Sequence, residues 1–208
     1  MPKIVDAEAR RQEVVQAVFR IIASDGLERA SLREVADEAG LAVGSVRHYF
    51  SSSDELLVFS FGTVIDRITA RLGAALDTVR DHAAGSPERH ASVLNLLGQF
   101  LPLDEESAVD ACVWMAFRHA ARINPVFAAE AERSHRSVAA VVGQLIVLLS
   151  PGEAGAPQNL VTEAERLLAT LDGLCMHALL QPEWMTAEMC SDVLTAHLAV
   201  FDAVPAAG

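Results

Sequence analysis

The chain has 208 residues, 51% of them hydrophobic and 21% charged, and its formal net charge is −12 at pH 7. This length allows one or two domains with a buried core. The most apolar run, residues 138–149, contains Gln144 and is too short to span a membrane, since a spanning helix needs about 20 residues. We therefore do not expect this chain to be a membrane protein. Many Ala, Leu and Glu residues and few alternating β-branched runs predict an all-α fold.

The first predicted helix covers residues 10–25 and has one apolar side. The residues of that side follow the three-and-four spacing of a helix and are Val14, Val15, Val18, Phe19 and Ile22. Gly26 ends the helix, because glycine adopts the backbone conformation that a helix end often needs at low cost.

Residues 31–50 then predict two short helices joined by a tight turn. Ser31 is a good N-cap, and Glu34 three residues later completes a capping box. Gly40 ends the first helix, and the second covers residues 43–49. Two helices of this length can place one of them in the DNA major groove.

The spacing inside this unit is more specific than the helices themselves. Ala36 is small where two crossing helices approach, Gly40 follows at the turn, and Val46 fills the gap between the helices. Val46 and Phe50 fall on the inward side of the second helix. This pattern resembles a helix-turn-helix, although an ordinary helical hairpin in an all-α core has the same features.

The flanking segments extend the pattern to a known family. Ser52 and Glu55 form another capping-box pattern, which begins a long helix. The helix ending in Asp25-Gly26, the stretch SLREVADEAGLAVGSVRHYF and the stretch SSSDELL together resemble the TetR family of transcriptional regulators. The resemblance covers about the first 60 residues strongly, and the remaining chain matches in length and helical organisation.

The resemblance implies two parts with separate tasks. Residues 1–52 would form a three-helix DNA-binding head, and residues 53–208 would form a six-helix body that binds a small ligand. The last two helices of the body would pair with those of a second subunit as a four-helix bundle. We therefore expect a homodimer on a double-stranded DNA operator, controlled by a small-molecule effector.

Seven residues of the head, together with Ser53 directly after it, are the expected DNA contacts, with Ser45 and Arg47 at base edges and the others mostly at the backbone. They are Ser31, Arg33, Gly44, Ser45, Arg47, His48, Tyr49 and Ser53. The family usually has an aromatic residue in place of Arg47 and a lysine near Ser53. Gly44 would let the backbone approach DNA closely.

Charge is a complication for a DNA-binding head. Residues 1–60 hold seven Lys and Arg against ten Asp and Glu, and residues 61–208 hold nine against eighteen. We infer weak non-specific affinity for DNA and a need for dimerisation to gain avidity.

Breaker residues divide the rest of the chain into six further helices, which gives nine in all. The expected helices cover residues 54–82, 87–101, 105–122, 125–149, 160–180 and 186–204, with a Gly/Pro/Ala loop over 151–159. Large side chains with a few polar neighbours make the expected ligand site, which comprises Phe100, Trp114, Phe117, Arg118, His119 and Phe127. An alternative is that the aromatic residues are core and the charged ones are solvated.

The last two helices carry apolar stripes that are too broad for one small core, and these stripes are the expected dimer contacts. They comprise Leu167, Leu171, Leu174, Ala178, Met189, Val193, Leu194, His197 and Phe201. Ordinary packing within one chain is the alternative.

Other chemistry lacks support in the sequence. The three cysteines share no metal-ligand spacing, and an odd number without a signal-peptide core predicts reduced thiols in the cytoplasm. The single Glu132-x-x-His135 pair lacks the second pair that a di-iron bundle needs. We expect no enzyme, cofactor or metal, and we predict a ligand-responsive transcriptional regulator, more specifically a repressor. The alternatives are an all-α enzyme and a helical interaction protein that has lost DNA binding.

Overall fold

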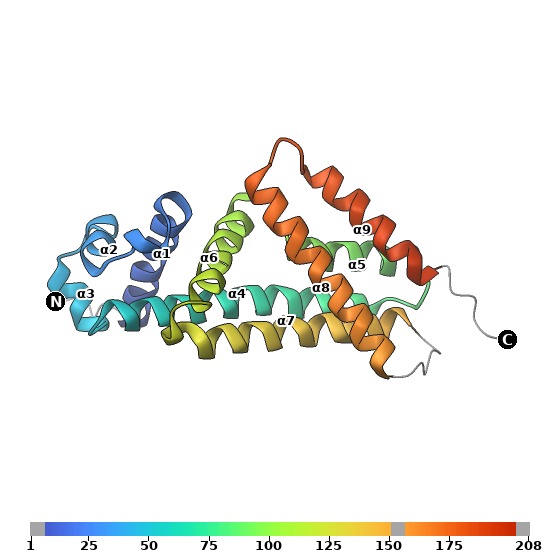
Figure 1. Ribbon diagram of the computed structural model, residues 1–208, viewed down its shortest axis with the longest axis horizontal. Helices are drawn as coiled ribbons and strands as arrows, with labels where there is room; N and C mark the ends of the chain where they lie inside the picture. Colours follow the sequence, from blue (N-terminus) through green and yellow to red (C-terminus); the bar gives the residue numbers. More distant parts are fainter. Residues whose placement is uncertain (1–6, 151–156, 203–208) are drawn as a thin grey trace, which may run out of the picture. The chain divides into compact units, whose positions relative to one another are not determined.

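The computed structural model describes residues 7–150 and 157–202, with the backbone alone for residues 157–159 and 200–202. Over these residues the fold is all-α (Figure 1), which confirms the expected fold class. The α-helices are α1 (Ala7–Asp25), α2 (Leu32–Glu38), α3 (Val43–Tyr49), α4 (Ser53–Asp81), α5 (Pro87–Gly98), α6 (Glu105–Ala121), α7 (Ala128–Leu149), α8 (Pro157–Leu180) and α9 (Ala187–Asp202). Two short 3-10 helices are η1 (Leu27–Arg29) and η2 (Pro125–Phe127).

The described residues form two compact units. The first lies within Met1–Arg67 and Cys112–Arg133, and the second lies within Ile68–Ala111 and Ser134–Gly208. Helices α4, α6 and α7 each contribute residues to both units. The expected head at residues 1–52 falls inside the first unit, and its boundary stays a prediction.

In the first unit, α1 packs against η1 and α2, and α2 packs against α3. The predicted apolar side of α1 is buried in full, which confirms its five residues as core: Val14, Val15, Val18, Phe19 and Ile22. Val35 and Ala36 of α2 and Val46 of α3 are also buried. The three helices therefore share one small core around α1.

The turn between α2 and α3 has the geometry that the sequence predicts. Gly40 has a φ of 65°, in the left-handed region that glycine adopts without strain. The Gly40 N–H donates to the Asp37 carbonyl at 3.2 Å, and the Leu41 N–H donates to the Ala36 carbonyl at 2.9 Å. These two bonds make a Schellman motif, which satisfies the last carbonyls of α2 and reverses the chain toward α3.

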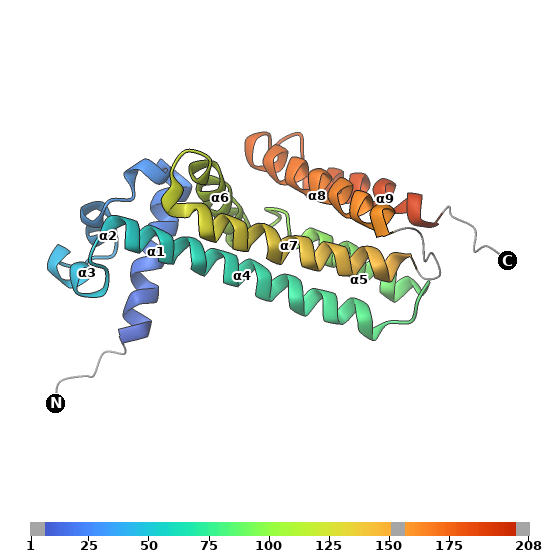
Figure 2. The ribbon, with the colours of Figure 1, turned by 60° about the horizontal axis from the view of Figure 1, so that its bottom comes forward.

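In the second unit, α9 contacts both α5 and α8. Figure 2 shows α8 and α9 side by side, joined by the turn at residues 181–186. Ser86 caps α5 by accepting a hydrogen bond from the Arg89 N–H at 3.1 Å, with Pro87 in the first turn. Arg71 of α4 forms an ion pair with the buried Asp110 of α6.

Several helix ends differ from the sequence-based expectation. Helix α5 ends at Gly98 and not near Leu101, because the chain tightens into turns in which the Phe100 and Leu101 N–H groups donate to the Leu97 and Gly98 carbonyls. The expected helix at residues 125–149 begins with the 3-10 turn η2, where the Asn124 side chain accepts a hydrogen bond from the Val126 N–H at 3.1 Å.

The loop predicted at residues 151–159 ends three residues earlier than expected. Helix α8 already begins at Pro157, a residue that the first turn of a helix tolerates well. Residues 151–156 of that loop, and residues 203–204 of the last predicted helix, lie outside the described residues.

Candidate DNA-binding surface and effector core

The outward face of α3 carries half of the expected DNA contacts. Four positions of this helix are exposed, and they are Gly44, Ser45, Arg47 and His48. Val46 and Phe50 are buried on the other side and fix the helix to the core. Tyr49 is half-buried and meets the His48 ring edge to face, with ring centroids 5.2 Å apart. Helix α3 can therefore present its polar face to a partner without disturbing the core.

The start of α2 supplies two further expected contacts. The Ser31 hydroxyl accepts a hydrogen bond from the Glu34 N–H at 3.3 Å, so Ser31 is the N-cap that the sequence predicts. The Glu34 carboxylate pairs with Arg29 at 3.4 Å. Arg33 is exposed in the first turn.

Ser53 is the first residue of α4 and is half-buried. The cap at this helix end differs by one residue from a regular capping box. Ser52 accepts from the Glu55 N–H at 3.1 Å, but the Glu55 carboxylate accepts from the N–H and hydroxyl of Ser51, at 2.8 and 2.6 Å. The side-chain bond from Ser51, followed by its backbone bond, lowers the pKa of Glu55. The carboxylate stays ionised and holds the α3–α4 connection.

The arginines of the head differ in their availability. Arg10, Arg20 and Arg29 form ion pairs with Glu13, Glu38 and Glu34. Arg11 lies over the rings of Phe59 and Phe50, at 4.2 and 5.0 Å from their centroids. Within the described head, Arg33 and Arg47 are the two arginines for which the structure shows no ion pair or ring contact. These two charges are the ones left to meet phosphates or base edges.

Neither packing nor backbone conformation within the protein requires a glycine at residue 44. A Cβ atom placed there would meet nothing within 4 Å, and its φ lies outside the left-handed region, unlike that of Gly40. The open space in front of Gly44 is part of the exposed face of α3.

The expected effector residues on α6 are distributed between core and surface. Phe117 stacks on Phe61 of α4 with ring centroids 4.8 Å apart and planes 13° apart. Phe127 meets both rings nearly edge to face, and all three side chains are buried. Sequence reasoning missed Phe61, whose burial follows from its place on the inner side of α4.

The polar candidates on α6 lie closer to the surface. Trp114 is 8% exposed, and the guanidinium of Arg118 lies 4.3 Å from the centre of its ring. His119 is exposed. Phe100 belongs to the second unit, in the turn after α5, where it is half-buried.

The expected dimer residues are mostly buried within one chain. Buried members of α8 and α9 are Leu167, Leu171, Leu174, Ala178 and Leu194. Met189, Val193 and His197 keep partial exposure, and the Phe201 side chain lies outside the described residues. Exposed apolar side chains in the same region are Val161, Met176, Leu180 and Trp184. The exposed side of these helices therefore carries apolar side chains in addition to those that the sequence suggested, and the dimer contacts stay a prediction.

Two further features of the described residues concern the requirements of a metal site and of a membrane-spanning helix. Over residues 7–150 and 157–202, no cluster of three or more His, Cys, Asp or Glu is arranged to hold a metal ion. Within the same ranges, no helix is both long enough and apolar enough to span a membrane.

Comparison with known proteins covers both parts of the chain. Residues 14–58 match the family of bacterial regulatory proteins named tetR, and residues 89–202 match the C-terminal part of BetI-type transcriptional repressors. The HTH-type transcriptional regulator PksA of Bacillus subtilis (strain 168) is 35% identical over 201 residues, which are 95% of this chain and 92% of that protein.

Solved structures give the same relationship. A transcriptional regulator from Rhodococcus sp. Rha1 superposes with a TM-score of 0.78 at 30% identity, over 94% of this chain and 99% of that one. A regulator from Saccharomonospora viridis, solved in complex with choline, has a TM-score of 0.74 at 19% identity, over 93% and 95% of the two chains. The second similarity shows the fold alone.

These relatives are transcriptional regulators and not enzymes, so the alternative of an all-α enzyme is set aside. The helix-turn-helix in α2 and α3 and the helical body after it agree with the matches over residues 14–58 and 89–202. The chain belongs to the TetR family of transcriptional regulators.

Proposed function

We propose that this chain is a homodimeric repressor that binds a near-palindromic double-stranded operator and releases it when a small effector binds. Each subunit would place α3 in the major groove, with the two grooves about 34–36 Å apart. Ser45 and Arg47 would contact base edges. Ser31, Arg33, His48, Tyr49 and Ser53 would contact phosphates or sugars, and Gly44 would allow close backbone approach.

One observation carries this proposal. Residues 1–60 of the chain hold more acidic than basic side chains, yet Arg33 and Arg47 are exposed and form no ion pair with the described residues. Arg47 lies on the outward face of α3, which a Schellman turn holds against α2. Few phosphate contacts mean that affinity must come from specific contacts and from two subunits acting together.

Selection of random duplex DNA by the full chain tests the proposal. The expected product is a pair of inverted half-sites, and scrambling one half-site should reduce affinity far more than a single mismatch does. Recovery of no enriched sequence would instead favour the alternative of an interaction protein that has lost DNA binding.

We infer the repressor role and the cytoplasmic location from the same family. The C-terminal match is to BetI-type transcriptional repressors. A reporter gene placed behind the selected operator should be silenced by the chain in a bacterial cytoplasm. Increased expression would make the protein an activator instead.

The effector site is proposed around α6 in the first unit, near Trp114, Phe117, Arg118, His119 and Phe127. Phe100, which belongs to the second unit, stays a separate candidate from the sequence. The rings of Phe61, Phe117 and Phe127 supply apolar surface, and Arg118 and His119 supply polar groups. The choline complex of the Saccharomonospora viridis regulator makes choline a reasonable first probe.

Tryptophan fluorescence tests this site directly. The chain has two tryptophans, Trp114 at 8% and Trp184 at 72% exposure, so Trp184→Phe leaves one reporter on α6. Titration of this variant with choline and with a small library should change the Trp114 emission for a compound that also releases the operator. A compound that releases the operator without changing Trp114 emission would show that the effector binds at a site away from Trp114.

The dimer is proposed to form through the exposed face of α8 and α9. Val161, Ala169, Met176 and Leu180 are exposed and follow one another along α8 at intervals of eight, seven and four residues, which places them on one side of the helix. Met189, Val193 and His197 of α9 are at least partly exposed and remain candidates. The buried leucines that the sequence suggested as dimer contacts would then support this face from inside the subunit, with Ala178.

A further inference from the structure

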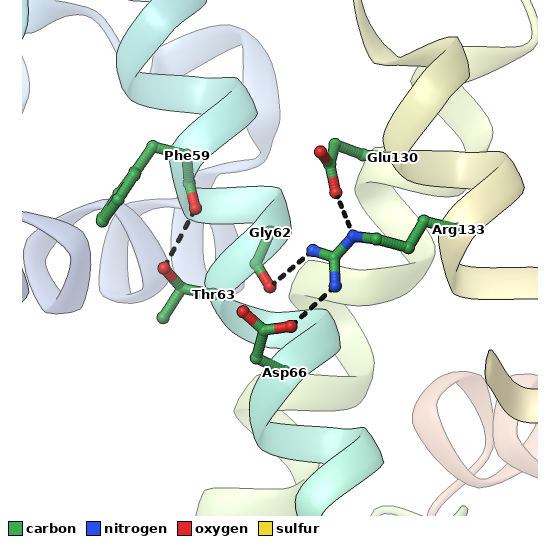
Figure 3. Close-up of polar contacts among 6 residues, drawn as sticks. All are labelled: Phe59, Gly62, Thr63, Asp66, Glu130 and Arg133. Carbon is green, nitrogen blue, oxygen red and sulfur yellow. Dashed lines mark hydrogen bonds and ion pairs between the residues drawn. The ribbon is translucent and has the colours of Figure 1, made fainter.

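Arg133 of α7 joins two helices of the first unit through all three nitrogens of its guanidinium (Figure 3). Its Nε donates to the Glu130 carboxylate at 2.8 Å, on the same helix. Its Nη1 donates to Asp66 Oδ1 at 2.6 Å, and its Nη2 donates to the backbone carbonyl of Gly62 at 3.2 Å, both on α4. We name these four residues the Arg133 clasp.

Gly62 is the residue that makes room for the clasp. A Cβ atom at this position would lie 3.2 Å from Arg133 Nη2 and 3.8 Å from the Glu130 carboxylate. A side chain on residue 62 would therefore press on the guanidinium that binds the adjacent carbonyl. The glycine is explained by this close approach and not by its backbone angle, since it lies inside a regular helix.

The same part of α4 is a weak section of a long helix. Gly62 lowers helix stability at its own position, and the Thr63 hydroxyl donates to the Phe59 carbonyl at 3.0 Å, a type of bond that often bends helices. Three residues after Phe59, the Gly62 carbonyl accepts a hydrogen bond from Arg133, which lies on another helix. The clasp thus fixes a helix section whose own sequence leaves room for bending.

The position of the clasp along both helices is informative. The first unit ends at Arg67 on α4 and at Arg133 on α7, so the Asp66–Arg133 pair of the clasp joins the two helices within one residue of the point where each continues into the second unit. Asp66 is exposed and Arg133 is 39% exposed, and ion pairs in such places contribute little to stability. The same guanidinium also bonds the Glu130 carboxylate and the Gly62 carbonyl, so the three bonds together, and not the ion pair alone, hold the two helices in one geometry.

We propose that Arg133 is a positioning residue for DNA binding. It holds the section of α4 at Phe59–Asp66 in one geometry against α7, and it thereby sets the distance between half-sites that the dimer accepts. This inference rests on the proposed function, because a half-site distance is defined only for a DNA-binding dimer. No contact between Arg133 and DNA is involved.

Half-site spacing provides the test. The selected operator is compared with two duplexes whose half-sites are moved one base pair apart or together, by fluorescence anisotropy with the full chain. Arg133→Ala should lose about fivefold to tenfold in affinity for the selected spacing, within the usual range of coupling between sites, while the two altered duplexes change little. Its preference for the selected spacing should therefore be largely lost.

Two more variants make the result independent of one substitution. Asp66→Asn removes the ion pair across the helices and should weaken the spacing preference in the same direction. Arg133→Lys keeps the charge but cannot reach three acceptors in a plane, so it should restore the preference only in part. Preference for bases within each half-site should stay as in the wild type, because α3 is unchanged.

Arg10→Ala is the matched control, because Arg10 pairs with Glu13 three residues away on α1, in the same unit as Arg133, and is 30% exposed. It should leave the spacing preference intact. Wild-type spacing preference in both Arg133→Ala and Asp66→Asn would overturn the inference, and so would an equal loss of affinity on all three duplexes. A wild-type chain that selects no duplex would overturn the proposed function, and the inference with it.

Discussion

Arg47 stands out among the residues of the head because it forms no ion pair with the described residues, whereas most neighbouring arginines are occupied. Arg20 and Arg29, by contrast, are held by Glu38 and Glu34 at 2.5 and 3.4 Å. Counting charges in the sequence therefore misjudges this head, since the acidic residues neutralise particular arginines and leave others available. The local charge on α3 is positive although residues 1–60 as a whole are acidic.

Arg47→Ala should weaken operator binding by about 1–3 kcal/mol if the guanidinium contacts a base edge, and should relax the preference at that base pair. Anisotropy titration with duplexes that differ at each position would measure both effects. Arg20→Ala is the control, because Arg20 is already paired with Glu38. Equal losses in the two variants would indicate a general charge effect and remove Arg47 from the specific contacts.

The variant Gly44→Ala separates an effect on folding stability from an effect on DNA affinity. The space around residue 44 is empty in the protein, so alanine should leave the unfolding free energy unchanged or raise it by up to about 1 kcal/mol. Operator affinity should nevertheless fall, because the added methyl group lies on the face that meets DNA. Thermal unfolding and anisotropy measured together would check this, and unchanged affinity would show that the backbone does not approach DNA at this residue.

At the scale of helices, Arg11 links α1 to the start of α4. Its guanidinium lies over Phe59 and Phe50, and its Nε is buried without a hydrogen-bond partner among the described residues. Stacking on aromatic faces suits the planar guanidinium, whose hydration is weak. Arg11 therefore contributes to packing of the head more than to its external charge.

Arg11→Met should lower the unfolding free energy by about 1–2 kcal/mol, because a partly desolvated stack on two rings is lost. The neighbouring Arg10→Met should lower it by less than about 0.5 kcal/mol, since Arg10 makes only an exposed pair with Glu13. Chemical denaturation of both variants gives the comparison. A similar loss in the two would mean that the stack adds no stability.

The helices of the head could be predicted well because local signals decide them. The bounds of α3, the cap at Ser31 and the turn at Gly40 all follow from short sequence patterns and agree with the structure. The short helices η1 and η2 were missed, since three-residue helices have no periodic pattern to detect.

Contacts between distant residues could not be predicted in the same way. Gly62 and Arg133 are 71 residues apart, and neither residue alone indicates that one makes room for the other. The stripes on α8 and α9 show a related limit. Periodicity indicates that Leu167 and Leu171 face an apolar surface, but it cannot tell whether that surface belongs to the same chain or to a second one.

At the scale of the whole molecule, the proposed binding to DNA requires two subunits. An exposed apolar face on α8 has no partner within the described chain, and Leu180 and Trp184 at its end are 70% and 72% exposed. Exposed apolar patches of this kind commonly mark interfaces. A single head with few unpaired arginines would bind DNA weakly. Specific binding to an operator therefore depends on two heads in one dimer.

Leu180→Glu should convert the proposed dimer to a monomer at micromolar concentration, because a charge would replace an apolar side chain whose burial in the interface is worth about 1.5–3 kcal/mol. Sedimentation velocity would show the change, and operator affinity should fall with it. Val147→Glu on α7 is the control, as Val147 is 58% exposed on a different helix. A dimeric Leu180→Glu variant would exclude this face from the interface.

Hydroxyl-radical footprinting of the wild-type chain on its selected operator tests the central claim most directly. If the chain is a dimer that reads DNA through α3, two protected patches should appear on one face of the duplex. Their centres should be one helical turn, about 10–10.5 base pairs, or a multiple of it apart, and related by a two-fold axis. A single protected patch, or protection that is uniform along the duplex, would contradict the account.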